Sequence, residues 1–271
     1  MASLRSKRRG AYMSLVEIQD RGPVRHVVMN RAEKRNALND ELIRGLGEAF
    51  EEAAGDDGVR VVVVRGDGPM FSSGMDIAGL RALSENPDSI HEMREPILRW
   101  WNLLEEMPKT TIAQIHGGAI GGAMELALAC DLRVMAEDAV TGLVETRIGL
   151  IPDVGGSTRL PAIVGLGNAK ELIMTGKLID GREAHRIGFA NRIAPADELD
   201  AATEQLANEL LACAPRAVAL AKRVIDAAAK PDLAGSLDRE VEAQAELAAS
   251  EDFAEGARAF TDKRQPEFAG R

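Results

Sequence analysis

The sequence predicts an α/β fold built around a largely parallel sheet, with a helical region at its C-terminal end. Short β-branched runs alternate with longer segments in which apolar residues recur at helical spacing. Loops rich in glycine and polar residues follow several runs, as expected where ligands bind at the carboxyl ends of parallel strands. From about residue 197 onward, four helical segments follow without a strand pattern. We therefore expect a core over residues 14–196 and a helical region over residues 197–271.

The expected strands are apolar or β-branched runs bounded by turn residues. They cover residues 14–18, 24–29, 59–64, 110–115, 132–135 and 189–193. The turn at residues 20–23 separates the first two strands. The run at 59–64 is continuously apolar apart from Arg60, which is typical of a strand buried on both faces.

The expected helices carry apolar residues three and four positions apart. Before the C-terminal region they cover residues 40–54, 88–107, 167–175 and 180–187. Asn39 is a suitable N-cap for the first of them, and Gly55 is a suitable end. Pro108 ends the second helix.

Composition limits the classes of function. The chain has 271 residues and a formal net charge of −10, which argues against general nucleic-acid binding. No apolar run reaches the length of about 18 residues that a membrane span needs. Cys130 and Cys213 lie in apolar stretches, and we expect both to be buried free thiols. Free thiols fit a reducing compartment, either the cytoplasm or a eukaryote's mitochondrial matrix. The basic residues 1–13 predict a disordered or targeting arm.

The stretch at residues 115–131 is a small-residue loop that leads into an apolar helix with one carboxylate, Glu125. Its glycines indicate close approach to the backbone, and a helix start offers free N–H groups and partial positive charge. An acid among apolar neighbours has a raised pKa. These features together fit oxyanion stabilisation and proton transfer. The alternative is a glycine-rich turn before a packed helix, with Glu125 reaching solvent.

Two further acids, Glu145 and Asp153, lie close to glycine and apolar residues. Each taken alone also fits a surface turn, and Asp153 is well placed to cap a helix that starts at the following glycines. Dinucleotide-binding, phosphate-loop, zinc-protease and serine-hydrolase motifs are absent from the sequence. Acid–base chemistry by carboxylates therefore remains the leading hypothesis.

Four ordered segments resemble the enoyl-CoA hydratase/isomerase (crotonase) superfamily. They lie at residues 30–39, 71–77, 118–127 and 145–161, and the resemblance extends over about residues 14–268. It implies a crotonase-like spiral of ββα units and a homotrimer or dimer of trimers assembled through the C-terminal helices. It also implies an acyl-CoA thioester substrate, with no metal and no cofactor apart from the coenzyme A of the substrate.

The resemblance also assigns roles in substrate binding. The backbone N–H groups of Met75 and Gly122 match the oxyanion hole that holds the thioester oxygen as it becomes an enolate. The remaining positions that match the coenzyme A site are Lys34, Arg35, Ala37, Ser73, Asp76, Ile77, Ala78 and Lys263. Among these, Lys34, Arg35 and Lys263 are the cations suited to the phosphates.

Glu125 and Glu145 match the two catalytic glutamates of the hydratases, so the primary hypothesis is hydration of a 2-trans-enoyl-CoA to a 3-hydroxyacyl-CoA. Glu125 would activate water and Glu145 would deliver the α-proton. Asp153 matches an acid of dienoyl-CoA isomerases and of 3-hydroxyisobutyryl-CoA hydrolases, which leaves isomerisation as the main alternative. Glu125 disfavours the hydrolase, and retention of both glutamates disfavours a non-catalytic acyl-CoA-binding protein. The candidates for the acyl channel are Met75, Ile77, Leu80, Trp100 and Trp101, and the alternative is that these apolar residues belong to the core.

Overall fold

The main sheet is six-stranded and almost entirely parallel, as the sequence predicts. The computed structural model describes residues 15–271, so the predicted arm at residues 1–13 lies outside the described part. The strands run in the order β1 (Val16–Arg21), β2 (Val24–Met29), β3 (Val61–Gly66), β4 (Thr110–Ile115), β6 (Leu132–Ala136) and β9 (Arg192–Ala194). β1 pairs antiparallel with β2, and every other neighbouring pair in this sheet is parallel.

A second, smaller sheet contains three strands that the sequence analysis missed. They are β5 (Gly118–Ile120), β7 (Val140–Gly142) and β8 (Ile179–Asp180). Each is only two or three residues long, too short for an alternating pattern to appear in the sequence. β5 turns the chain from the end of β4 toward the glycine-rich loop, and this turn sets the position of Glu125.

The helices before the C-terminal region lie mostly where the sequence predicts them. They are α2 (Asp40–Gly55), α3 (Ile77–Glu85), α4 (Ile90–Glu106), α5 (Gly122–Ala129), α6 (Gly156–Val164), α7 (Leu166–Thr175) and α8 (Gly181–Arg186). The Asn39 side chain accepts a hydrogen bond from the Leu42 N–H, which confirms the predicted cap. Helix α3 was not predicted. The 3₁₀ turns are η1 (Ala32–Lys34), η2 (Pro87–Ser89), η3 (Glu145–Ile148) and η4 (Ala196–Glu198).

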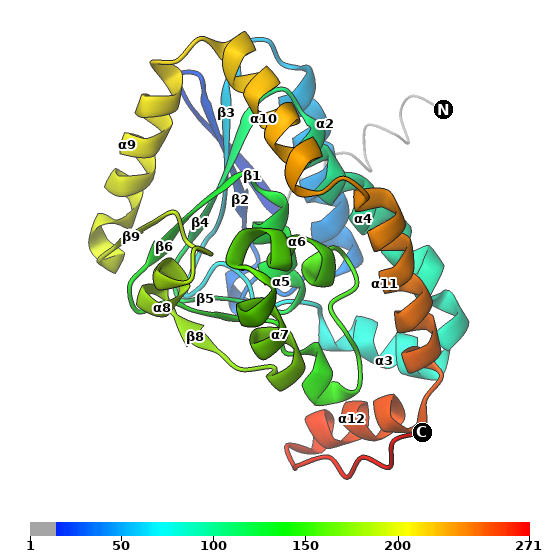
Figure 1. Ribbon diagram of the computed structural model, residues 1–271. Helices are drawn as coiled ribbons and strands as arrows, with labels where there is room; N and C mark the ends of the chain where they lie inside the picture. The colour runs from blue at the N-terminus through cyan, green and yellow to red at the C-terminus, as the bar shows by residue number, and fades with distance from the viewer. Residues whose placement is uncertain (1–14) are drawn as a thin grey trace, which may run out of the picture.

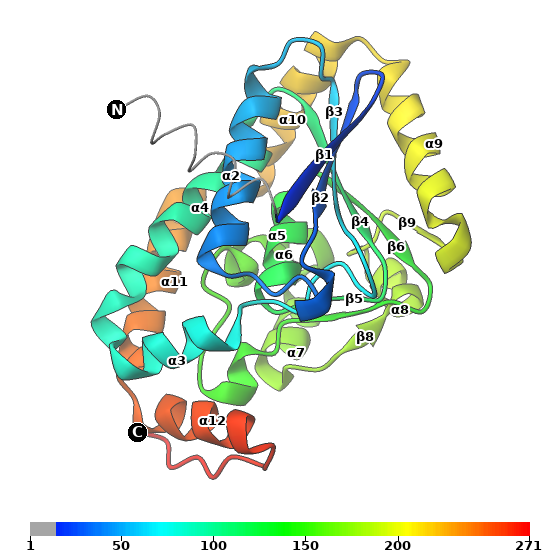
Figure 2. The ribbon, with the colours of Figure 1, turned by 180° about the vertical axis from the view of Figure 1, so that it is seen from behind.

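Helices cover both sides of the main sheet. α9 (Leu199–Leu211) packs on one side, against β4, β6 and β9, and α2 packs on the other, against β1 and β2 (Figures 1 and 2). Every residue of α5 is buried. A helix buried on all faces explains why its sequence is apolar throughout rather than amphipathic.

The C-terminal helices return to the loops that follow the strands. After α10 (Pro215–Ala229), α11 (Leu233–Ala248) packs on α4 and α6, and α12 (Glu251–Asp262) packs on α3 and η3. Figure 1 shows α12 at the end of the molecule farthest from the tips of β1 and β3. Residues of α11 and α12 therefore contribute to the cavity described below. No helix of residues 15–271 has both the length and the apolarity to cross a membrane.

The prediction for the two cysteines is half wrong. Cys130 is buried at the end of α5, and burial raises the pKa of its thiol to about 12. Cys213 is exposed, because it lies in the surface link between the end of α9 at Leu211 and the start of α10 at Pro215. Apolar neighbours in a sequence do not bury a residue that falls between two helices.

Candidate active site

Two free backbone N–H groups meet beside the start of α5. Gly122 is the first residue of α5, so its N–H has no intrahelical acceptor. The Leu38 N–H donates to the Gly74 carbonyl, and the Leu38 carbonyl accepts from the Asp76 N–H. The N–H of Met75, between these two residues, has no acceptor within residues 15–271. A Cβ added to Gly74 would lie 3.6 Å from the Gly122 nitrogen, so the two loops are in contact. These are the two N–H groups that the family resemblance assigns to the oxyanion hole, and both residues line the cavity described below.

Glu125 lies one turn into α5 and is only 2% exposed. Its Oε1 accepts hydrogen bonds from the N–H groups of Val154 at 2.9 Å and Gly156 at 2.8 Å. A Cβ on Gly156 would lie 2.8 Å from this oxygen, so only glycine allows the approach. The alternative in which Glu125 reaches solvent is therefore wrong. Two fixed donors hold one oxygen, and Oε2 has no protein partner among the described residues.

Glu145 begins η3 and approaches the same helix start from the other side. A Cβ on Gly121, whose φ is +55°, would lie 2.7 Å from Glu145 Oε1. Glycine at this position thus permits both the turn into α5 and contact with the carboxyl group. Glu145 Oε2 is buried without a hydrogen-bond partner among residues 15–271. Burial raises the pKa of Glu145 to about 8.

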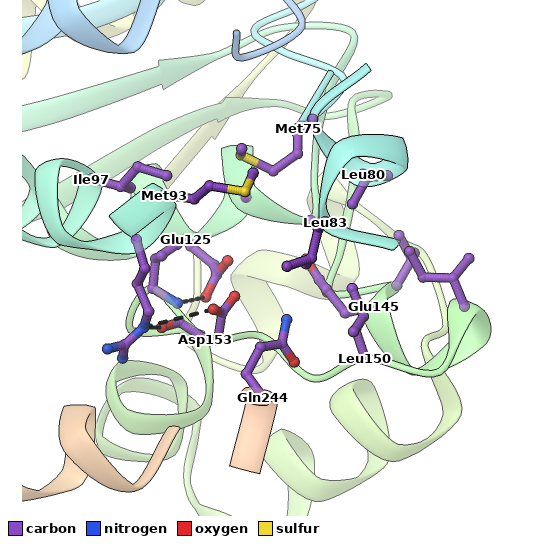
Figure 3. A pocket seen from close by; sticks show the side chains of 18 of the residues that line it. Met75, Leu80, Leu83, Met93, Ile97, Glu125, Glu145, Leu150, Asp153 and Gln244 are labelled. Atoms are coloured by element: carbon purple, nitrogen blue, oxygen red, sulfur yellow. Dashed lines mark hydrogen bonds and ion pairs between the residues drawn. The ribbon is translucent and has the colours of Figure 1, made fainter. Parts of the chain in front are cut away.

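Asp153 is a third carboxyl group on the cavity wall, and it does not cap a helix. The N-cap of α6 is Gly155, with no side-chain hydrogen bond. The Asp153 carboxyl lies 3.7 Å from the Nε of Arg94, which also donates to the Asp153 carbonyl (Figure 3). Burial raises the pKa of Asp153 to about 7, although the positive charge of Arg94 acts in the opposite direction.

The three carboxyl groups affect one another. Burial raises the pKa of Glu125 well above its usual range, and the charges of Glu145 and Asp153 raise it further. Groups this close titrate together rather than independently. In the substrate-free site, burial therefore raises the pKa values of all three acids above the usual carboxyl range, which suits donation and acceptance of protons near neutral pH.

The rest of the cavity is mostly apolar, and it encloses about 200 Å³. Its apolar side chains are Met75, Leu80, Leu83, Ile90, Met93, Ile97, Ile120, Val144, Ile148, Leu150, Val154 and Phe260. Met75 and Leu80 were predicted here. The prediction was wrong for Trp101, which is fully buried in the core, and for Trp100, which packs against Gly47 of α2 and donates to Glu51. Ile77 is half exposed and lies outside the cavity.

Of the residues expected to bind coenzyme A, Ser73, Met75 and Gly122 line this cavity. Lys34 and Arg35 are exposed in and after η1, and Lys263 is exposed at the end of α12. The Ser73 N–H donates to the Arg35 carbonyl, and Ser73 itself lines the cavity. The basic loop after β2 and the loop after β3 are therefore joined.

A second connection fixes the start of α3. Asp76 caps α3 by accepting from the Ala78 N–H, and it also accepts from Arg31, which donates in addition to the Ala37 carbonyl. These contacts lower the pKa of Asp76, with the Ala78 hydrogen bond as the largest cause. Both Asp76 and the Ala78 N–H are thus engaged in holding the loop.

Sequence analysis missed several residues that organise the site. Asn36 is buried, and its Nδ2 donates to the carbonyls of Asp67, Met70 and Phe71, which fixes the loop before Met75. Its φ of +52°, unusual for a residue other than glycine, marks this constraint. Arg94 and Gln244 lie in helices whose periodicity gave no sign of a role in the cavity.

Replacement of Gly156 by alanine is expected to lower kcat by about tenfold or more, because the new Cβ displaces the Glu125 carboxyl from its geometry. Contact with Pro152 Cβ at 2.6 Å adds overpacking, so we expect a loss of stability of about 1–3 kcal/mol. Steady-state kinetics and thermal unfolding measure the two effects. Gly167→Ala in α7 is the control, since nothing lies within 4 Å of its added Cβ. The steric account fails if both variants keep the wild-type kcat.

The geometry defines a class of site: paired backbone donors at a helix start, with buried acids beside them. Such a site can hold an oxyanion while a carboxyl group moves a proton. No cluster of three or more potential metal ligands occurs within residues 15–271.

Comparisons with known proteins agree with this class. The family model described as enoyl-CoA hydratase/isomerase matches residues 20–271. The human enoyl-CoA hydratase domain-containing protein 2, mitochondrial, is 40% identical, over 92% of this chain and 86% of its own length. The mouse methylglutaconyl-CoA hydratase, mitochondrial, is 36% identical, over 97% of this chain and 88% of its own length. A crystal structure of an enoyl-CoA hydratase from Mycobacterium avium subsp. paratuberculosis K-10 superposes with a TM-score of 0.83 at 33% identity. The match covers 94% of this chain and 98% of that one. The chain belongs to the enoyl-CoA hydratase/isomerase family and has the crotonase fold.

Proposed function

We propose that the protein is an enoyl-CoA hydratase, which adds water across the double bond of a 2-trans-enoyl-CoA to give a 3-hydroxyacyl-CoA. The observation that carries this proposal is the position of two glutamates, the buried Glu125 and the partly buried Glu145, beside one helix start. Glu125 is held by Val154 and Gly156, and Glu145 lies against Gly121. A hydratase needs one group to activate water and another to supply a proton.

In the proposed mechanism, the N–H groups of Met75 and Gly122 bind the thioester oxygen. Oε2 of Glu125, in its ionised form, removes a proton from water as the water oxygen attacks the β-carbon. The electron pair of the double bond moves into the thioester and gives an enolate, which the two N–H groups stabilise. Protonated Glu145 then delivers its proton to the α-carbon. Loss of a single oxyanion-hole donor typically costs about 2.7–4 kcal/mol of transition-state stabilisation.

For the rest of the substrate, Lys34, Arg35 and Lys263 supply positive charge for the phosphates of coenzyme A. The loop residues Ala37, Ser73, Asp76, Ile77 and Ala78 form the path of its pantetheine and adenine parts. The reaction requires no metal or redox cofactor, because the thioester itself accepts the electron pair.

Isomerisation of an acyl-CoA double bond is the second candidate, because Asp153 places a third acid in the same cavity. A turnover panel of 2-enoyl-, 3-enoyl- and dienoyl-CoA thioesters, with products identified by mass and chirality, separates the two. Hydration of 2-enoyl-CoA to a single 3-hydroxyacyl-CoA enantiomer is the expected result. Turnover restricted to the 3-enoyl or dienoyl substrates would favour the isomerase. Loss of the main activity in Asp153→Asn but not in Glu125→Gln would favour a hydrolase.

A homotrimer or dimer of trimers is proposed as the assembly. α11 and α12 pack on their own chain, but α10 has no buried residue and exposes Leu220, Val224 and Ile225. Light scattering in solution measures the mass directly. The proposed location is a reducing compartment, either the cytoplasm or the mitochondrial matrix, and the human and mouse relatives above carry mitochondrial names.

A further inference from the structure

The cavity contains a hydrogen-bond donor that the proposed mechanism does not use. Gln244 of α11 lines the cavity and is 2% exposed. Its Oε1 accepts from the Ile151 N–H at 3.0 Å. Because that N–H can only donate, the amide is fixed with its oxygen toward Ile151 and its nitrogen on the opposite side. Figure 3 shows the nitrogen directed into the cavity, and it has no partner within residues 15–271.

Arg94 lines the same cavity and is its one basic residue among those the structure describes. It is 5% exposed, and its Nη2 donates to the carbonyl of Leu237, two turns before Gln244 on α11. Its Nη2 also lies 4.0 Å from Glu240, and its Nε lies 3.7 Å from Asp153. Arg94 and Gln244 therefore line the cavity from two packed helices, α4 and α11, with Asp153 beside Arg94.

Gln244 is only 2% exposed, and its free nitrogen is open to the cavity, where a ligand or water can accept from it. A plain alkyl chain has no acceptor beyond the thioester. We infer that Gln244 is a specificity-determining residue, whose Nε2 donates to an oxygen on the distal carbons of the acyl group. A terminal carboxylate is the acceptor that best suits this donor, because a charged oxygen forms a stronger hydrogen bond than a neutral one. The inference rests on the proposed acyl-CoA substrate, and it specifies the acyl class.

The test compares two saturated five-carbon thioesters that hydration cannot consume, pentanoyl-CoA and glutaryl-CoA. Calorimetry gives Kd for each with the wild type, Gln244→Met and Gln244→Glu. The methionine variant removes the donor with little change of volume. The glutamate variant loses the amide donor but keeps an acceptor for the Ile151 N–H. It therefore separates loss of the donor from loosening of the loop at Ile151. Glu242→Gln, on the exposed face of α11, is the matched control.

Wild-type protein is expected to bind glutaryl-CoA more tightly than pentanoyl-CoA. This preference should fall by about tenfold or more in both Gln244 variants and remain in Glu242→Gln. Equal weakening of both ligands would reduce Gln244 to a packing role and overturn the inference, as would an unchanged ratio of the two Kd values. Because binding is measured without turnover, the result is separate from the hydratase proposal. Preferential glutaryl-CoA binding by a protein that hydrates no enoyl-CoA would overturn the proposed function alone.

Discussion

Glu125→Gln is expected to lower kcat for hydration of crotonyl-CoA by about 10²–10⁴-fold. The amide oxygen can still accept from the N–H groups of Val154 and Gly156, so the loop keeps its anchor. The amide cannot take a proton from water, so the chemical step is lost while the fold remains. Steady-state kinetics with crotonyl-CoA measure the change in kcat. Thermal unfolding and a separate measurement of CoA-thioester binding confirm that the variant is folded. Retention of the full rate would contradict the paired-glutamate assignment.

Glu145→Gln is expected to change activity and stability in opposite directions. Hydration falls by about 10²–10⁴-fold, because the acid that protonates the α-carbon is gone. The free energy of unfolding at pH 8 rises, on the order of a few kcal/mol, because the folded state no longer has to bury a charge. Kinetics and urea unfolding at pH 8 measure the two effects. Loss of both activity and stability would indicate a structural role instead.

The pKa values of Glu145 and Asp153 predict how wild-type stability depends on pH. Burial raises the pKa of Glu145 from 4.5 to about 8 and that of Asp153 from 3.8 to about 7. The folded state binds these protons more tightly than the unfolded state. The stabilisation is therefore complete below the unfolded pKa values, and it is lost as the pH rises to about 8. In Glu145→Gln the slope of stability against pH should be smaller over this range, with the Asp153 part retained.

Much of the fold can be predicted from the sequence because long elements carry their own periodicity. The continuous valine run of β3 and the cap at Asn39 are examples. Four elements gave no such signal. The strands β5, β7 and β8 are two or three residues each, and α3 follows directly from the site loop that ends at its cap, Asp76. Local pattern is too weak in short elements, and tertiary contacts decide them.

Some residues of the candidate site can likewise be predicted from the sequence, and others cannot. Glu125 and Glu145 stand out because each is an acid in a largely apolar segment with glycines a few positions away, and the structure brings both to the start of α5. Gln244 and Arg94 could not be found this way. Each lies in an ordinary amphipathic helix, and the packing of α11 on α4 is what brings both to the cavity. The error over Trp101 has a similar cause, since a core aromatic and a cavity aromatic look alike in a sequence.

The most direct test of the account follows the oxygen of water. The protein is incubated with crotonyl-CoA in ¹⁸O-labelled water, and the thioester products are resolved by mass. We expect 3-hydroxybutyryl-CoA that carries one ¹⁸O atom in its hydroxyl group, formed by Glu125→Gln about 10²–10⁴-fold more slowly than by the wild type. Recovery of an unlabelled double-bond isomer, or of free coenzyme A with labelled carboxylic acid, would contradict the central claim that this site adds water to an enoyl-CoA.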